Sequence, residues 1–197
     1  MGFDIYGIRP FERSPLPPTI DYKSASKEES VEYSSKISEW YDENPGGYLR
    51  LALGGWAPMV GLMKLANRKY NLNINMRNWE YNDGYGLRNI EKCIKLAESL
   101  ENISSEIKKW LTRIGVDNDE VEDYIFGINR NSWERVDQIK ISKDEEKKLI
   151  YRFASRTVTN YNYTINGIEY VTSYATNLRT INVLIVFLKE CGGFSIW

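Results

Sequence analysis

The chain has 197 residues, of which 42% are hydrophobic and 27% are charged, so wholesale disorder is excluded and one domain with a single sizeable core is expected. Its formal net charge of −1 argues against a protein that holds nucleic acid nonspecifically, since such proteins usually carry an excess of Lys and Arg. The absence of histidine excludes Ser-His and Cys-His nucleophile pairs, His-ligated zinc sites and histidine pH switches.

The first part of the chain is predicted to form a strand, an extended connection and a helix. Residues 3–8 alternate and are rich in aromatic and β-branched types, which predicts the strand. Prolines between 10 and 18 exclude a helix or a central strand there. Ser24 or Ser26 can cap a helix that runs to about Glu43. The apolar side of that helix consists of Val31, Ile37, Trp40 and Tyr41.

A second helix and a long loop follow the break at Asn44-Pro45-Gly46-Gly47. An apolar run at 48–53 leads to the pair Gly54-Gly55. Pro58 then fits the first turn of a helix over 57–67, because proline lacks the N–H that this position leaves unpaired. Residues 71–85 are polar and rich in asparagine, which predicts a loop.

The clearest periodicity predicts a long amphipathic helix over 90–114, ended by Gly115 and carrying at most one break, near 102–105. The acidic stretch 117–120 then predicts the first turn of a short helix that extends to about Ile128. The apolar positions of the long helix recur every three or four residues: Ile90, Ile94, Ala97, Leu100, Ile103, Ile107, Trp110 and Ile114.

The last part of the chain mixes helices and strands. A capping box predicts a helix over 142–155. Asn166-Gly167 between two β-rich runs predicts a hairpin over 157–174. A helix over 176–190, with Leu178, Ile181, Leu184, Ile185 and Leu188 inward, is followed by a short strand at 194–197. Helices with a few strands near both ends give an α+β class, with 1–197 as one domain.

Cysteine usage and hydropathy indicate the compartment. Cys93 and Cys191 are too few for a disulfide framework or a Cys-only zinc site, so we expect two free thiols in a reducing environment. The first residues lack the basic and apolar regions of a secretory signal. The longest apolar stretch, 48–66, is interrupted by charged residues, glycines and a proline, so no membrane span is expected. We therefore expect a cytoplasmic protein.

Polar and aromatic residues gather at 79–86, Trp79-Glu80-Tyr81-Asn82-Asp83-Gly84-Tyr85-Gly86. Glycines let a backbone approach a ligand closely, and successive N–H groups in such a turn can hold an anion. Aromatic faces can stack on a base or a sugar. The alternative is a structural turn in which Asn82 or Asp83 caps the next helix.

A second candidate is Arg50, which lies in an otherwise apolar run. A largely buried guanidinium needs an acidic partner or an anionic ligand, and we expect Asp83 or Glu80 as the partner. Trp56, two residues before Pro58, is typical of a packed helix entry.

These motifs together resemble a family of small proteins, mostly phage-encoded and also found in bacteria, that has no assigned activity. Such proteins begin Met-Gly-x-Asp-x-Tyr-Gly, continue with Gly-x-Tyr-Phe-Arg and Trp-x-Pro-Leu, and then carry a Trp-x-x-Asn-Asp-Gly-x-Gly-Leu loop and a Gly-Gly-Phe tail. The matching residues here are Gly2, Asp4, Tyr6, Gly7, Gly47, Tyr48, Arg50, Trp56, Pro58, Trp79, Asn82, Asp83, Gly84, Gly86, Leu87, Phe187, Leu188, Gly192, Gly193, Phe194 and Trp197.

The resemblance implies a phage or mobile-element origin and supplies no known reaction. It does not extend over 115–170, which we interpret as a candidate inserted subdomain. Where the loop of the family often has a second acid this chain has Tyr85, which argues against a metal-binding carboxylate pair. The stretch from Leu51 to Gly55 also departs from the family, which usually has Asn-Asn and a further Trp there.

We therefore expect the first strand, the Arg50 segment and the Asn82 loop to converge on one pocket. Its predicted ligand-binding residues are Asp4, Arg50, Trp56, Trp79, Asn82, Asp83, Gly84, Tyr85 and Gly86. No catalytic residue, metal or cofactor is indicated. In this hypothesis Arg50 pairs with an anionic group, a Trp or Tyr85 stacks on a ring, and the glycines expose backbone donors.

The leading hypothesis is a phage-type accessory binding protein in the host cytoplasm, which antagonises an anti-phage defence by binding a host protein or a nucleotide-like signal. The alternative is a carboxylate-dependent, metal-assisted hydrolase of a nucleotide-like substrate, with Asp83, Glu80 or Asp4 as general base or metal ligand. A third hypothesis is a protein inhibitor that uses aromatic residues around Trp133 and the hairpin. Nucleic acid and membrane are not expected partners, and the oligomeric state stays open, with a homodimer as one option.

Overall fold

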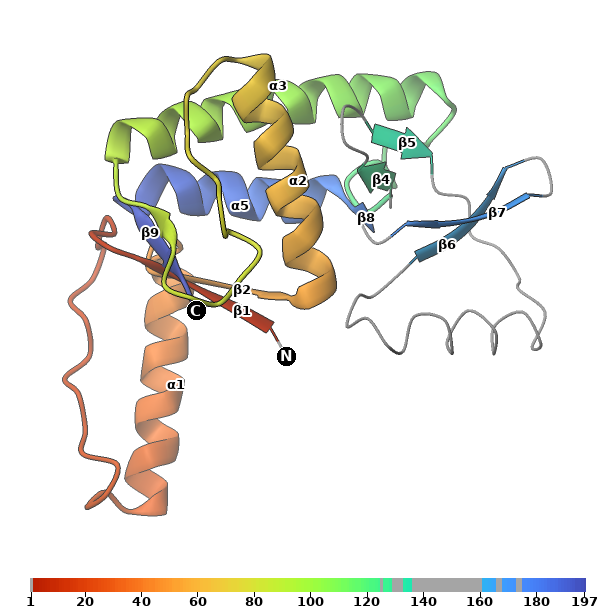
Figure 1. The fold of residues 1–197 in the computed structure, drawn as a ribbon. Helices are drawn as coiled ribbons and strands as arrows, with labels where there is room; N and C mark the ends of the chain where they lie inside the picture. Colours follow the sequence, from red (N-terminus) through yellow and green to blue (C-terminus); the bar gives the residue numbers. More distant parts are fainter. Residues whose placement is uncertain (1, 125, 129–132, 136–160, 166–167, 173–174) are drawn as a thin grey trace.

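The computed structural model describes residues 2–124, 126–128, 133–135, 161–165, 168–172 and 175–197, which form an α+β fold as predicted (Figure 1). The helices are α1 (Lys27–Glu43), α2 (Leu53–Lys69), α3 (Ile90–Arg113) and α5 (Leu178–Glu190). The strands are β1 (Gly2–Gly7), β2 (Tyr48–Ala52), β3 (Gly86–Leu87), β4 (Phe126–Ile128), β5 (Trp133–Arg135), β6 (Tyr161–Ile165), β7 (Ile168–Thr172), β8 (Ala175–Thr176) and β9 (Phe194–Ile196).

The main sheet joins segments that are far apart in the sequence. Its strand order is β2-β1-β9-β3, and every neighbouring pair is antiparallel. The expected strand near residue 195 is therefore confirmed as β9, with Phe194 and Ile196 buried between β1 and β3. This arrangement places β3, directly before α3, one strand away from β1, with β9 between them.

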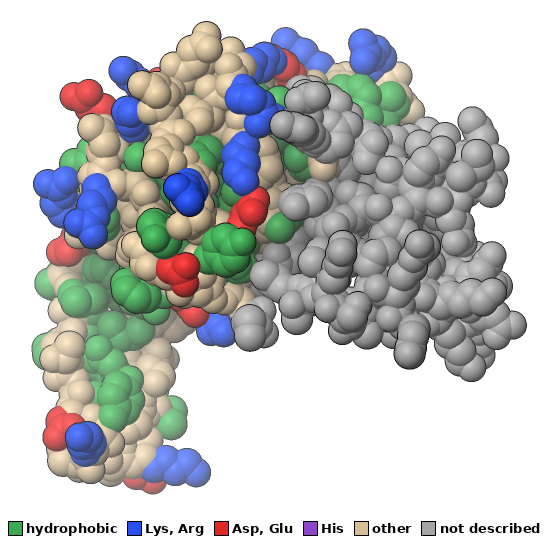
Figure 2. All heavy atoms as spheres, in the orientation of Figure 1, with side chains coloured by type: hydrophobic (Ala, Val, Ile, Leu, Met, Phe, Trp, Pro, Cys, Tyr) green, Lys and Arg blue, Asp and Glu red, His purple; other side chains and the backbone are tan. Residues whose placement is uncertain are grey.

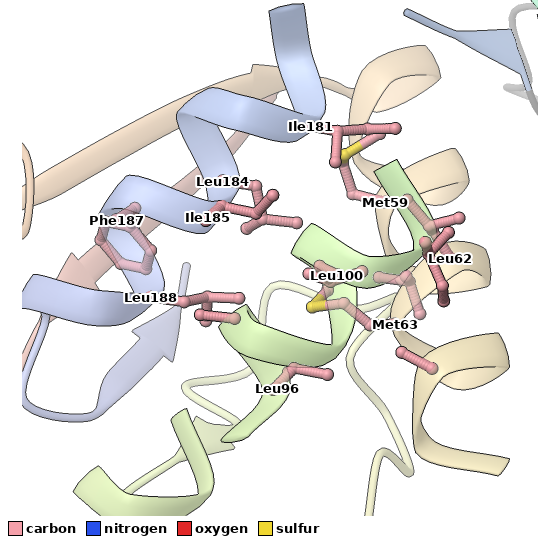
Figure 3. Packing of buried hydrophobic residues seen from close by; sticks show 14 of the residues in the cluster. Met59, Leu62, Met63, Leu96, Leu100, Ile181, Leu184, Ile185, Phe187 and Leu188 are labelled. Carbon is pink, nitrogen blue, oxygen red and sulfur yellow. The ribbon is translucent and has the colours of Figure 1, made fainter. Parts of the chain in front are cut away.

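The hydrophobic core lies between the sheet and three helices. The helices α3 and α5 run side by side, and α2 crosses them (Figure 1). Burial of these side chains supplies the main driving force for the fold. The buried residues that face one another there are Met59, Leu62, Met63, Leu96, Leu100, Ile181, Leu184, Ile185, Phe187 and Leu188 (Figure 3).

Several sequence predictions are confirmed by the elements. The cap of α1 is Ser26, which forms a capping box with Glu29. Gly115 follows α3 with a φ of 92°. All five residues predicted to face inward on α5 are buried. Strands β6 and β7 pair antiparallel with Ile165 opposite Ile168, as a hairpin with a two-residue connection requires. Both cysteines are free and buried.

Two predictions for the helices are wrong in part. The helix α2 begins at Leu53 directly after β2, so Pro58 lies inside it. The helix α3 is unbroken, and Ala97, Leu100, Ile103 and Ile107 are buried as predicted, whereas Ile90 and Ile94 are exposed and Cys93 and Leu96 are buried instead. The buried side of α3 is the one that packs against α5 and α2.

The helix predicted over 117–128 is absent. Two successive turns occupy this stretch, closed by hydrogen bonds from Glu120 N to Asp117 O and from Tyr124 N to Glu120 O. Phe126 and Ile128 are then drawn into β4, where both side chains are buried. The predicted helix over 142–155 lies outside the described residues.

The segment 8–26 and α1 form an arm that projects from the rest of the molecule (Figure 1). No side chain between Tyr6 and Glu39 is buried. Val31, predicted on the apolar side of α1, is 63% exposed, and Trp40 is the residue of that helix that is buried. Apolar side chains are visible along the arm in Figure 2. Of the predicted apolar side of α1, Trp40 is buried, Ile37 and Tyr41 are half-buried, and Val31 is exposed.

Candidate anion-binding cavity

The first strand, Arg50 and the Asn82 loop do meet, at the beginning of β1. Asp4 on β1 is paired with Arg50 on β2, and Arg50 Nε lies 3.6 Å from Asp4 Oδ1. The side-chain amide of Asn82 donates to the carbonyl of Gly2 at 3.2 Å. The Tyr48 hydroxyl also donates to Asp4 Oδ1. The three segments are therefore adjacent, but Asp4, Arg50 and Asn82 line neither the cavity between residues 74–79 and 85–92 nor the groove beside Tyr41 and Tyr48.

The environment of Arg50 differs from the prediction. Its side chain is 67% exposed, and its acidic partner is Asp4 rather than Asp83 or Glu80. Glu80 instead pairs with Lys64 at 2.6 Å. In an antiparallel pair, directly opposite side chains share one face of the sheet, so β2 presents Arg50 beside Asp4 toward solvent. An exposed arginine satisfied by a neighbouring carboxylate does not require a ligand.

Burial and the hydrogen bond to Asp4 raise the pKa of Tyr48 to about 12. Removal from water disfavours the tyrosinate, and the adjacent carboxylate adds like-charge repulsion. Tyr48 is therefore a hydrogen-bond donor at neutral pH.

Both tryptophans predicted as stacking platforms belong to the core. Trp56 and Trp79 are each 1% exposed. Trp56 Nε1 donates to the carbonyl of Trp79 at 2.6 Å. The Trp56 ring packs 6.0 Å from that of Phe3, and the Trp79 ring packs 5.1 Å from that of Phe194. These rings are already covered by protein, so the predicted stacking role is wrong for Trp56.

The loop glycines let β9 and Trp197 approach closely. Gly84 has a φ of 74°, and its N–H donates to Ile196 O at 2.8 Å. The prediction that this N–H is free to bind a ligand is therefore wrong. A Cβ on Gly84 would lie 2.9 Å from the Trp197 ring, and one on Gly86 would lie 2.0 Å from Phe194 O. Packing of the loop accounts for both glycines.

Asn82 and Asp83 do not cap α3. The N-cap is Asn89, whose side chain accepts from the N–H of Lys92 at 2.8 Å. Asp83 is exposed. The structural alternative for this turn is therefore also wrong.

A cavity of about 750 Å³ lies beside this loop, between residues 74–79 and 85–92. Of the predicted site residues, Trp79, Tyr85 and Gly86 line it, whereas Asp4, Arg50, Trp56, Asn82, Asp83 and Gly84 do not. Its other polar lining residues are Asn75, Arg77, Asn78, Arg88, Asn89 and Lys92. The cavity therefore combines cations, carboxamides and one partly exposed aromatic ring, that of Tyr85.

The lining of this cavity is positively charged. Arg77, Arg88 and Lys92 contribute cations, and no Asp or Glu lines it. Within the described part of the chain, the guanidinium groups of Arg77 and Arg88 take part in no hydrogen bond or ion pair. Lys92 Nζ donates to the carbonyl of Asn73 at 2.5 Å. The beginning of α3 adds the positive end of a helix dipole.

These groups can bind an anion and contain no catalytic pair. Guanidinium and ammonium groups donate charge-assisted hydrogen bonds to phosphate or carboxylate. Tyr85 is about half exposed, so one face of its ring can stack on a flat group. The side-chain carboxamides of Asn75, Asn78 and Asn89 can each donate and accept hydrogen bonds.

The hydrolase alternative names the carboxylates of Asp4, Glu80 and Asp83 as general base or metal ligand. Asp4 accepts from Tyr48 and faces Arg50, and Glu80 pairs with Lys64. Among the residues that the structure describes, no three acidic or cysteine side chains gather where they could hold a metal ion. No helix of this part of the chain is long and apolar enough to cross a membrane.

Sequence reasoning missed Arg77, Arg88 and Lys92. The sequence feature that could have indicated them is that Arg77 precedes the stretch 79–86 and that Arg88 and Lys92 follow it. Comparison with protein-family models, curated proteins and solved structures finds no match to this chain. The resemblance to the phage-encoded family stays a prediction.

Proposed function

We propose that this protein is an accessory binding protein whose ligand is a small, nucleotide-like anion held in the cavity of Arg77, Arg88 and Lys92. The observation that carries the proposal is the set of three cations around a cavity of about 750 Å³ with no carboxylate in its lining. Cavities of small-molecule sites have volumes of about 300–1,000 Å³. An anion of two or more charges would complement this lining.

Each part of a nucleotide has a counterpart in the lining. Arg77 and Arg88 can grip a phosphate with paired N–H groups, as the planar guanidinium favours. Tyr85 can stack on the base. Asn78 lines the cavity and has a φ of 67°, in the left-handed region. Its carboxamide is the group we assign to the edge of the base.

The resemblance supports the biological setting of the proposal. A phage-type protein in the host cytoplasm that sequesters a nucleotide-like signal would antagonise a defence that depends on that signal. In this proposal the protein removes the signal by binding it, and no bond of the ligand is broken.

Calorimetric titration with a panel of mono-, di- and cyclic nucleotides and inorganic phosphate tests the proposal. We expect one nucleotide class to bind the wild type. The double variant Arg77→Ala/Arg88→Ala should lose about a hundredfold or more in affinity, since it removes at least two hydrogen bonds to a charged group and each contributes about 1.5–3 kcal/mol. Arg50→Ala is the matched control and should bind as the wild type. Absence of binding to the wild type, or equal binding to the double variant, would refute the proposal.

A further inference from the structure

The proline-rich segment of the arm has a regular conformation with one outward edge. Each proline fixes its own φ and keeps the preceding residue extended, so Pro15, Pro17 and Pro18 hold residues 15–18, which follow a bend at Ser14, near polyproline II. That helix has three residues per turn. The burial follows the same period, because Ser14, Pro17 and Ile20 are half-buried and the residues between them are exposed.

We call the exposed side, which carries Pro15 and Pro18, the outward edge. Residues three apart lie on the same side of a polyproline II helix, so these two rings form one ridge. Leu16, which is also exposed, stands beside it. Proline pairs with this spacing are the recognition unit of proline-rich ligands, which dock in grooves with aromatic walls.

The arm is fixed at both ends. Near its base, Trp40 Nε1 donates to Ser14 O at 2.9 Å, and Asn44 Nδ2 donates to Ser14 Oγ at 3.1 Å. Farther along, the Tyr22 ring packs edge-on against that of Tyr33 in α1, at 5.8 Å. The segment therefore lies along α1 (Figure 1) and cannot turn toward the body of its own chain. Such preorganisation lowers the entropy lost on docking.

A groove of the complementary kind lies on the same chain, between the end of α1, strand β2 and α5. Its volume is about 550 Å³. Tyr41 and Tyr48 wall it, with ring centroids 4.9 Å apart. Val183 and Val186 form its apolar side, and Val183 is 50% exposed. Valines on the outward side of a helix are unusual, since polar residues are expected there. We call this the tyrosine-walled groove.

We propose that the outward edge of one molecule docks in the tyrosine-walled groove of a second copy. The chain carries both halves of the contact, so a two-fold pair would form it twice. The charges agree with this pairing. Arg9, at the base of the arm, has an exposed side chain with no partner among the described residues, and Asp42, which lines the groove, is also exposed. The other two charged lining residues, Glu122 and Arg179, are already paired with Lys108 and Asp123.

Sedimentation equilibrium of the full chain over a wide concentration range tests this contact. We expect a concentration-dependent dimer. The double variant Pro15→Ala/Pro18→Ala should raise its dissociation constant about tenfold or more, because central contacts dominate an interface. Pro17→Ala is the matched control, since Pro17 is half-buried and does not lie on the outward edge, and it should change the constant by less than about threefold.

The groove is tested separately. Val183→Glu should weaken the dimer about tenfold or more, whereas Ile94→Glu, at an exposed apolar position of α3, should not. A mixture of the double proline variant with Val183→Glu should associate more strongly than either variant alone, because the mixed pair keeps one of the two contacts. Circular dichroism checks that the variants are folded. A monomeric wild type would overturn the proposal and would mean that another partner occupies the groove. A dimer that neither Pro15→Ala/Pro18→Ala nor Val183→Glu weakens would also overturn it.

Discussion

Asp4 and Arg50 stand directly opposite each other on β1 and β2, with Arg50 Nε 3.6 Å from Asp4 Oδ1. The register of the two strands creates this ion pair, which explains how an arginine fits into an apolar run. It also separates Arg50 from the cationic cavity, so the two can be tested independently.

The Asp4–Arg50 pair should contribute little to stability. Because Arg50 is mostly exposed, solvent screens the interaction, and Arg50→Met should change the free energy of unfolding by less than about 1 kcal/mol. Urea unfolding of the two proteins measures this. A loss of several kcal/mol would show that Arg50 is a structural residue of the sheet.

Tyr48 should make stability depend on alkaline pH. Its pKa in the folded protein is raised to about 12, from an ordinary value of 10.0, so folding favours the protonated hydroxyl. The stabilisation is fully present below pH 10.0 and is lost as the pH rises toward 12. Tyr48→Phe should therefore lose less stability than the wild type between these pH values. Equal losses in urea unfolding at both ends of the range would contradict this cause.

Gly84 should be more sensitive to substitution than Gly115, although both have a positive φ. A Cβ on Gly84 would meet the Trp197 ring at 2.9 Å, whereas one on Gly115 would meet nothing within 4 Å. Gly115→Ala should cost about 1–2 kcal/mol through backbone strain alone, and Gly84→Ala about 1–3 kcal/mol more, as overpacking does. Thermal or urea unfolding compares them. If the two variants were equally stable, the close approach of Trp197 to the loop would be wrong.

Trp56 should be needed for stability and not for ligand binding. Its Nε1 is a buried donor to Trp79 O, so Trp56→Phe leaves that carbonyl unpaired and should cost about 1–3 kcal/mol. Affinity for a nucleotide identified by calorimetry should stay unchanged, because Trp56 does not line the cavity. A loss of affinity in a folded Trp56→Phe protein would show that Trp56 takes part in ligand binding.

Local signals allowed much of the fold to be predicted. Ser26 with Glu29 specifies the start of α1, and Gly115 specifies the end of α3, because capping is decided within one turn of the chain. The hairpin β6–β7 follows from two adjacent residues. In contrast, Phe126 is drawn into β4 by pairing with distant strands, which no local pattern reveals.

The candidate site was predicted only in part for the same reason. The stretch 79–86 attracted notice by its composition, and Tyr85 and Gly86 do line a cavity. The charge of that cavity comes from Arg77, Arg88 and Lys92, which lie on both sides of this stretch in the sequence and line one cavity only in the folded chain. Arg50 stood out as an unusual residue, but its partner is set by strand register. Position in space, rather than residue type, decides which arginine can reach a ligand.

The most direct test of the anion site is a map of backbone amide chemical shifts during titration with the panel of nucleotides. The account predicts that one nucleotide class shifts the amides of Arg77, Tyr85, Arg88 and Asn89 most strongly, and that the shifts vanish in Arg77→Ala/Arg88→Ala. Shifts centred on the tyrosine-walled groove, at Tyr41 and Val183, or no shifts with any nucleotide, would contradict it.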